Sequence, residues 1–374
     1  MAILGCGYNG FFQLSPNSAK FSEWKVKEFK SIQLDLKPQE KILQCALSWS
    51  QIAFSTDQNR VIICGFNNSQ LTMAECQVSA LSLAIDSFQL LIATKEQDIH
   101  QWKKNVCQQV IWKDVTEKCK ITQIQAGEMN CVGIKEDGFP VEINQSQTDE
   151  DVFFACRPFP CKTKIKSVAC GVEHVLMLSE FGSVLSYGIG SRGQTGLGTT
   201  ERIQNAPQVI DALEGVKMIG IAAGNWHSAA ISDFGDIYTW GWNESGQLGL
   251  PCPNFPDACS VSANNKPSDI ERRDSVLIQA LPHLVFLPGE EKGAIAIKVA
   301  CGARHTAILS GDHHLLTCGW NAYGQLGHGD LVSRDCLTYV KQSCLSSCED
   351  CIKVLDVFCG GWNTVVLTDI SGFS

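Results

Sequence analysis

Apolar residues along this chain gather in short runs that end at glycine or at a turn-forming pair, and one such pattern recurs. The three clearest copies run from Val168 to Gly198, from Ile221 to Leu250 and from Val299 to Gly329. Each copy reads small-small-Gly-x-x-His, an apolar stretch, a turn near Gly, a strand ending in an aromatic residue or Cys then Gly, and a Gln-x-Gly turn. Short apolar runs between turn residues predict β-strands, and their repetition predicts one structural unit used several times.

Weaker copies follow the same frame and set the number of units. Residues 45–71 keep the Cys-Gly strand end, residues 126–143 keep the first Gly and an Asp-Gly turn, and residues 80–102 keep little beyond the apolar pattern. The chain ends each supply half a copy: residues 359–367 match the first half and residues 4–14 the second. Joined, the two halves complete a seventh unit.

The count predicts an all-β fold, a single seven-bladed β-propeller over residues 1–374, closed by N- and C-terminal strands. Seven units give about 53 residues each, enough for four strands and their loops. A ring closed in this way leaves no long free sheet edge. One interval between clear copies is longer than the others, and its excess, rich in Pro, Asn and Ser, predicts an inserted loop at 250–275 that projects from one face. Residues 16–41 and 145–166 are expected to be inter-blade stretches.

Composition narrows the functional class. Hydrophobic residues make up 44% of the chain, which is enough for a real core, and the net charge of −9 argues against a surface that grips phosphates throughout. The sequence opens MAILGCGYNG, without a basic and apolar leader, so the 19 cysteines are expected to be mostly reduced, buried thiols of an intracellular chain. No run of 18 or more apolar residues occurs, so no membrane contact is expected.

Several segments resemble cofactor-binding or metal-binding motifs, but a structural role explains each of them more simply. Residues 188–193 match a dinucleotide fingerprint, but the same frame recurs in the other copies as a repeat turn, and a Rossmann site would need a βαβ unit. His174, His227 and His305 recur once per copy and could suggest a metal. They would sit on different blades, so we expect structural histidines that hydrogen-bond backbone within their own blade.

Cys344, Cys348 and Cys351 have a spacing that could hold zinc, although no fourth ligand is evident; the alternative is a set of solvent-accessible loop thiols. No nucleophile elbow, Walker lysine, His-Glu-x-x-His or catalytic carboxylate pair is present. The sequence therefore favours a binding platform with no cofactor over an enzyme.

The repeats resemble those of the regulator of chromosome condensation family, whose units carry Gly-x-x-His-Thr/Ser and Trp-Gly-x-Asn-x-x-Gly-Gln-Leu-Gly turns. The match is most specific at 224–249 and 302–327. The resemblance implies a seven-bladed propeller in which the recurring positions are structural. These positions are Gly171, His174, Gly224, His227, Trp240, Gly241, Gly302, His305, Gly319 and Trp362.

The single propeller with a long insertion resembles chromatin-linked adaptor members of that family. This implies partnership with a Jumonji-C iron/2-oxoglutarate oxygenase, with effects on histone methylation, heterochromatin silencing, the mitotic spindle and chromosome segregation. It also implies a nuclear or chromosomal location, with the cytoplasm left open as a second one. It further implies a monomer, whose histone contact could be direct or indirect, and a hydroxylated arginine. The nearest candidate for that modification is Arg157, in a Pro-flanked stretch.

The family's founding member implies an alternative, guanine-nucleotide exchange on a small GTPase with nucleosome docking, for which 250–275 would be the inserted wedge. The absence of a basic segment before the closing strand and the acidic net charge count against it. A third reading is an interaction propeller for an unrelated pathway. The propeller face that binds a partner is left open.

Overall fold

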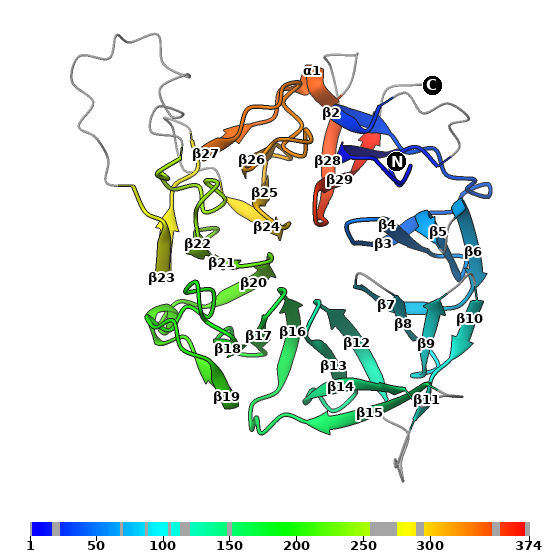
Figure 1. Cartoon of the computed structure of the whole chain (residues 1–374), viewed down its shortest axis with the longest axis horizontal. Helices are drawn as coiled ribbons and strands as arrows, with labels where there is room; N and C mark the ends of the chain where they lie inside the picture. Colours follow the sequence, from blue (N-terminus) through cyan, green and yellow to red (C-terminus); the bar gives the residue numbers. More distant parts are fainter. Residues whose placement is uncertain are drawn as a thin grey trace.

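The structure is a computed structural model that describes residues 2–16, 23–67, 70–86, 89–103, 106–112, 120–147, 152–254, 275–288, 295–345 and 352–370. Seven antiparallel sheets stand around a central axis like the blades of a propeller (Figure 1). The predicted all-β, seven-bladed architecture is confirmed. The blade that contains residues 80–102, which the sequence pattern marks only weakly, is a complete four-stranded sheet.

The blades are labelled A to G, and their strands are given from the channel outward. Blade A has β28 (Ile352–Cys359), β29 (Asn363–Ile370), β1 (Ala2–Tyr8) and β2 (Lys25–Ser31). Blade B has β3 (Ile42–Leu47), β4 (Gln51–Thr56), β5 (Arg60–Asn67) and β6 (Gln70–Gln77), and blade C has β7 (Ala80–Ile85), β8 (Leu90–Thr94), β9 (Ile99–Lys103) and β10 (Val106–Gln109). Blade D has β12 (Ile121–Ala126), β13 (Cys131–Lys135), β14 (Pro140–Gln147), β15 (Val152–Pro158) and an added β11 (Ile111–Trp112) that pairs parallel to β15.

The remaining blades contain the clearest repeats. Blade E has β16 (Ile165–Cys170), β17 (His174–Ser179), β18 (Val184–Gly188) and β19 (Ile203–Val209), and blade F has β20 (Met218–Ala223), β21 (His227–Ser232), β22 (Ile237–Trp242) and β23 (Ile278–Val285). Blade G has β24 (Ala296–Cys301), β25 (His305–Ser310), β26 (Leu315–Gly319) and β27 (Arg334–Tyr339). Two short helices, η1 (Asp211–Leu213) and α1 (Gln342–Leu345), lie in connections between blades.

Strands from the two ends of the chain close the ring. β1 pairs antiparallel with β29, from Ala2 opposite Thr368 to Gly7 opposite Asn363. The backbone hydrogen bonds of this pairing join the first and last parts of the chain in one sheet. The predicted closure by N- and C-terminal strands is therefore what the structure contains.

The hydrophobic core is divided among the seams between neighbouring blades. Between blades E and F, for example, Leu176 and Leu178 of β17 pack with Met218 and Trp240, all of them buried. β17, at the centre of its blade, is buried along its whole length, because both of its faces meet a neighbouring sheet. Burial on both faces explains why such strands read as continuous apolar runs in the sequence.

Two stretches that we expected to lie between blades each contain an outer strand of a blade. The stretch 16–41 contains β2, which pairs with β1, and the stretch 145–166 contains β15, which pairs with β14. β2 alternates two buried positions with exposed and half-buried ones, because its other side faces solvent. An outer strand therefore lacks the apolar run that marks a middle strand such as β17. Of the predicted inserted loop at 250–275, residues 255–274 lie outside the described part of the chain.

Candidate interaction surface

A repeated hydrogen-bond relay fixes the end of the propeller at which the Gly-x-x-His turns lie, which we call the histidine face. Nε2 of His227, at the start of β21, lies 2.9 Å from Oγ1 of Thr306 in blade G. That hydroxyl donates to the backbone carbonyl of Gln247, 2.6 Å away in the loop after β22 of blade F. The relay thus joins one blade to the next and returns to the loop of the first.

The same three-membered relay occurs at two further seams. His174 contacts Ser228 at 2.8 Å, and Ser228 donates to the Gln194 carbonyl at 2.8 Å. His305 contacts Thr364 at 3.0 Å, and Thr364 donates to the Gln325 carbonyl at 2.7 Å. Because each hydroxyl gives its one proton to a carbonyl, the histidine Nε2–H must be the donor to the hydroxyl.

These histidines are neutral. All three side chains are fully buried, and burial lowers the pKa of His174 and His227 to about 3 and that of His305 to about 4. The expectation that Nε2 would bond backbone within its own blade is wrong, since its partner is a hydroxyl of the neighbouring blade. The reason is geometric: the inner ends of adjacent blades converge, so the nearest polar group belongs to the neighbour.

Close packing accounts for the recurring first glycine of these turns. A Cβ at Gly224 would lie 2.2 Å from Cε1 of His227 and 2.4 Å from the carbonyl oxygen of Gly302 in the next blade. Gly171 and Gly302 have equivalent contacts. Gly-x-x-His is therefore a turn in which the ring lies against the glycine and against the neighbouring blade.

Amide side chains shape the loops of the histidine face. Asn321 Oδ1 accepts from the Leu326 N–H at 2.9 Å, while its Nδ2 donates to the carbonyls of Asp330 and Val332, both at 3.1 Å. Asn243 and Asn9 hold their own loops in the same way. The fingerprint-like segment 188–193 is the matching loop of blade E, where β18 leads into a turn and then β19; as predicted, it is a repeat turn.

A stack of arginine and tryptophan side chains stands on this rigid frame. The Arg192 guanidinium lies 4.5 Å from the ring centre of Trp226 and 4.7 Å from that of Trp242, and the two indoles meet edge to face at 5.5 Å. Arg304 lies over Trp242 at 4.6 Å and pairs with Glu244 at 3.3 Å. These residues come from blades E, F and G, and all five are half-buried. We call this set the arginine–tryptophan stack.

An aromatic cluster continues the surface into blades G, A and B. Trp320 packs edge to face against Trp362 at 4.8 Å and against Tyr323 at 5.2 Å, measured between ring centres. The backbone N–H of Trp320 donates to the backbone carbonyl of Arg304 at 2.8 Å, which places the cluster beside the stack. The cluster also includes Tyr8, Phe11, Trp24 and Trp49. Trp24 and Trp49 are among the exposed large hydrophobic residues, at 48% and 41%.

Sequence reasoning placed Trp362 among structural positions and did not single out the stack. The signal was in the repeat frame: the position just before the turn histidine, or its equivalent, holds Trp226, Arg304, Trp362 and Trp49 in four blades, whereas blade E has Glu173 there. The turn needs no large side chain there, because its glycine and histidine make the buried contacts. Large aromatic or arginine residues at such a position indicate binding rather than folding.

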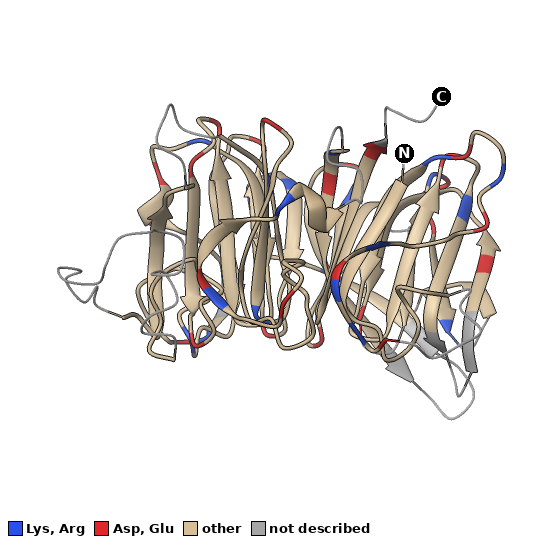
Figure 2. Ribbon diagram, turned by 90° about the horizontal axis from the view of Figure 1, so that it is seen from above, with Lys and Arg blue, Asp and Glu red and all other residues tan. Residues whose placement is uncertain are grey.

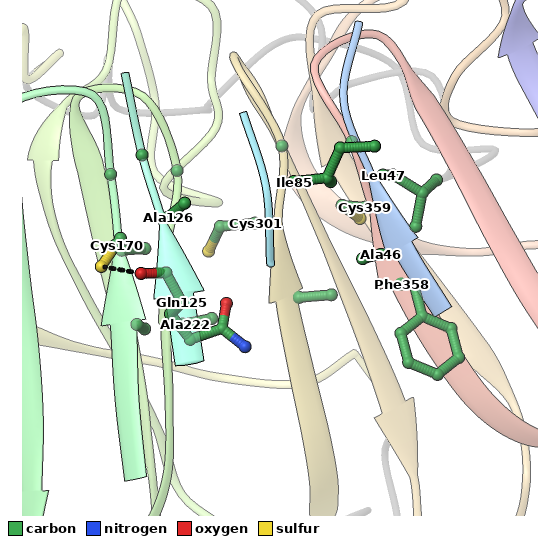
Figure 3. A pocket seen from close by; sticks show the side chains of 18 of the residues that line it. Ala46, Leu47, Ile85, Gln125, Ala126, Cys170, Ala222, Cys301, Phe358 and Cys359 are labelled. Atoms are coloured by element: carbon green, nitrogen blue, oxygen red, sulfur yellow. Dashed lines mark hydrogen bonds between the residues drawn. The ribbon is translucent and has the colours of Figure 1, made fainter. Parts of the chain in front are cut away.

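The central channel offers little chemistry. Its cavity, about 760 Å³, is lined by the innermost strands of the blades and mostly by small or neutral side chains, among them Ala126, Ala222 and Cys301 (Figure 3). The charged residues of the lining are Asp86, Glu128 and Lys298. Cys170 donates to the Gln125 carbonyl at 3.6 Å, and burial raises its pKa to about 12, so it is a protonated thiol. Burial likewise raises the pKa of Cys359 to about 12. Such thiols are poor nucleophiles and poor metal ligands.

Other predicted sites are placed as follows. Cys344 lies on α1 and is buried beside Leu4 and Cys6, so the expectation of an accessible loop thiol is wrong for this residue. Cys348 and Cys351 fall outside the described residues. Within the described part of the chain, no three His, Cys, Asp or Glu side chains gather as a metal-binding group, and no helix is long and apolar enough to cross a membrane.

Arg157 lies in β15 and is exposed, directly opposite Glu142 of β14. It is therefore a strand residue and not part of a free inter-blade stretch, because residues 152–158 complete blade D. β11 pairs with β15 only at Phe153 and Phe154, so the added strand ends before Arg157. Arg157 is near the β13–β14 turn, toward the face opposite the histidine face.

Charge is mixed over the molecule. Figure 2 shows Lys and Arg positions interspersed with Asp and Glu positions at both ends of the strands, without a face of single sign in that view. With a net charge of −9, this distribution does not favour binding driven by a polyanion such as a nucleic-acid backbone. The histidine face is distinguished by its aromatic and arginine content instead.

Comparison with known proteins places this chain in a class of β-propellers. Residues 182–231, 235–309 and 312–367 match the model of the regulator of chromosome condensation (RCC1) repeat. Together with the seven-bladed fold, this shows that the chain carries RCC1 repeats.

Among characterised relatives, the chain is similar to RCC1 domain-containing protein 1. It is 38% identical to the mouse protein over 227 residues, which cover 56% of this chain and 57% of the mouse protein. The human protein is also 38% identical, over 225 residues, 56% of this chain and 58% of the human protein. The matches therefore span little more than half the length of these relatives.

The solved structure of yeast Prp20p, described by its binding to Gsp1p and histones, superimposes with a TM-score of 0.78 and covers 98% of this chain and 91% of Prp20p. At 18% identity, the likeness to Prp20p shows the fold alone.

Proposed function

We propose that this chain is a non-enzymatic adaptor that binds a partner protein through the arginine–tryptophan stack and the adjoining aromatic cluster. The observation on which this proposal rests is that the Arg192 guanidinium packs against the rings of both Trp226 and Trp242 on a rigid face. Tryptophan, tyrosine and arginine dominate the energetic hot spots of protein interfaces, and half-buried side chains that are already ordered lose little entropy on binding.

The partner that sequence similarity favours is a Jumonji-C iron/2-oxoglutarate oxygenase acting in the nucleus at chromatin. The support is the 38% identity to RCC1 domain-containing protein 1, in keeping with the resemblance of the repeats. On this proposal the chain affects histone methylation, heterochromatin silencing and chromosome segregation on the mitotic spindle through its partner. The mixed charge of the surface supports indirect rather than direct contact with chromatin.

Affinity capture from nuclear extract tests this function. The intact chain should recover a Jumonji-C oxygenase, and Trp226→Ala should reduce recovery at least about tenfold, as expected for a hot-spot residue. Phe234→Ala is the matched control, because Phe234 is an aromatic residue, 76% exposed, on the β21–β22 turn at the opposite face. Equal recovery by Trp226→Ala and the intact chain would contradict the assigned surface. Recovery of other proteins without an oxygenase would contradict the assigned partner.

Arg157 is proposed as the hydroxylation substrate of that partner. Its exposed side chain and its position toward the opposite face separate it from the stack, so docking and modification can be tested independently. Incubation with the oxygenase, iron, 2-oxoglutarate and dioxygen should add one oxygen atom to the peptide that contains Arg157, and Arg157→Lys should abolish this gain. An unmodified Arg157 in the intact chain removes the assignment and leaves the adaptor role standing.

Guanine-nucleotide exchange is the second candidate. It is favoured by the superposition on Prp20p, whose structure report describes binding to Gsp1p. If the captured partner is a small GTPase that dissociates on nucleotide addition, and if the chain accelerates nucleotide release in a direct assay, exchange replaces the adaptor role.

A further inference from the structure

Two cysteines face each other at the outer rim of the seam between blades B and C. Cys76 lies on β6 and Cys107 on β10, the outermost strands of their sheets, which run side by side at the rim (Figure 1). Both side chains are half-buried and pack against the same seam cluster, which includes Val61 and Trp102. The register agrees, because Cys76 is opposite Val61 and Cys107 is opposite Trp102.

The two thiols, packed on the same cluster, are close enough to shift each other's pKa, and a histidine adjoins one of them. Nδ1 of His100, on β9, lies 3.9 Å from Cys107 Sγ. The site therefore contains a thiol pair from two blades and a base that contacts one member only.

This arrangement makes the two sulfurs unequal. The neighbouring Cys76 thiol, together with His100, lowers the pKa of Cys107 to about 6, although partial burial opposes the shift. The Cys107 thiol, and then burial, raises the pKa of Cys76. The thiolate is the nucleophilic form, so at neutral pH Cys107 is the attacking sulfur and Cys76 remains a thiol.

Cysteines elsewhere serve as internal contrasts. Cys64, Cys170 and Cys359 are also near other thiols or polar groups, but burial raises the pKa of each to about 12. They remain protonated. Cys64 is also buried, whereas Cys170 and Cys359 are half-buried at the channel. Reactivity toward an oxidant depends on thiolate character and access together, and Cys107 combines the two.

We propose that Cys76 and Cys107 form a hydroperoxide-reactive dithiol site whose oxidation closes a disulfide between the outer strands of blades B and C. The Cys107 thiolate attacks one peroxide oxygen, the O–O bond breaks, and hydroxide leaves and takes a proton, giving a sulfenic acid. The Cys76 sulfur then attacks Cys107, the S–O bond breaks, and the Cys76 proton leaves with the hydroxyl as water. Two thiols thus lose two electrons to one peroxide, which is reduced to two water molecules.

The bond would tie two blades that the described structure otherwise holds at this rim by packing. Its formation would cross-link residues far apart in the chain and so restrain opening of the seam. A thiol reductant reverses the reaction, which makes the site a reversible oxidation point rather than a permanent staple.

Peptide mapping of the intact, reduced protein after brief hydrogen peroxide treatment tests the proposal. A cross-linked peptide joining Cys76 and Cys107 should appear, with the loss of two hydrogen atoms, and dithiothreitol should remove it. Cys76→Ser should instead accumulate a sulfenic acid at Cys107 that a cyclic 1,3-diketone traps. Disulfides that join other cysteines first, or trapping at Cys76 in the Cys107→Ser variant, would overturn the assignment.

A second measurement isolates the contribution of His100. Iodoacetamide should label Cys107 at neutral pH at least about tenfold faster than the half-buried Cys161, and His100→Gln should lower the Cys107 rate. In urea the two rates should converge, because the folded environment is lost. Equal rates in the folded protein would contradict an activated Cys107.

Discussion

Trp240→Ala should lower the free energy of unfolding by about 3–5 kcal/mol, the cost of removing a fully buried large aromatic side chain. Trp240 is fully buried between blades E and F, in contact with the Leu176, Leu178 and Met218 cluster. Its indole Nε1 donates to the Gln194 carbonyl at 2.9 Å. Substitution therefore removes packing at the seam and a hydrogen bond that holds the adjoining loop. Urea unfolding followed by circular dichroism measures the change.

Two variants separate packing from hydrogen bonding in this prediction. Trp240→Phe keeps most of the packing and loses the N–H, so about 1 kcal/mol is expected; the Gln194 carbonyl still accepts from Ser228. Trp242→Ala, two residues along on the half-buried surface, should cost less than Trp240→Ala, because its side chain leaves no enclosed cavity. If Trp240→Phe lost as much stability as Trp240→Ala, packing would not be the main contribution.

The same contact explains a feature of the repeat that sequence alone left descriptive, the strand ending in an aromatic residue or Cys. Gln194 accepts from the Trp240 indole, whereas at the equivalent places Cys318 donates its thiol to the Gln247 carbonyl at 3.7 Å and Cys6 to the Gln325 carbonyl at 3.5 Å. Indole and thiol have in common a donor hydrogen on an apolar group. At these three positions the repeat keeps an apolar side chain with a donor hydrogen, while the size of that side chain differs between blades.

The fold was predictable because its constraints recur inside each blade. Gly224 is one example, since a Cβ there would strike the His227 ring, and Gly241 is another, with a φ of +105° that favours glycine. Each such requirement leaves a mark in the clear copies of the repeat. Outer strands such as β15 leave a weaker mark, because one side faces solvent and tolerates many residues.

The candidate surface was not predictable in the same way. Arg192, Trp226 and Arg304 come from three blades and from two kinds of loop, so their convergence depends on the angle between blades. None of them is required by the turn that carries it. The hydroxyl partners of the turn histidines were missed for the same reason, because they belong to the next blade.

Acid should destabilise this protein steeply through its buried histidines. The folded-state pKa values of about 3 to 4 for His174, His227 and His305 lie below the unfolded value of about 6.5, so the unfolded chain binds more protons below pH 6.5. Their neutral form is fully compatible with folding above pH 6.5, and stability falls as the pH drops toward the folded pKa values. Between pH 7.5 and 5 each histidine should cost about 2 kcal/mol, a sum of about 6 kcal/mol for the three.

His227→Asn isolates one third of that pH dependence. Asn363 occupies the equivalent turn position in blade A and is fully buried there, so asparagine is compatible with the turn. The variant should be less stable at pH 7.5, because the bond to Thr306 is altered, but it should lose about 2 kcal/mol less than the intact chain on acidification to pH 5. His328, whose pKa burial lowers to about 4, contributes equally to both proteins and cancels in the comparison. Identical pH profiles from urea unfolding would mean that the pKa of His227 is not lowered in the fold, which would contradict the neutral state assigned to it.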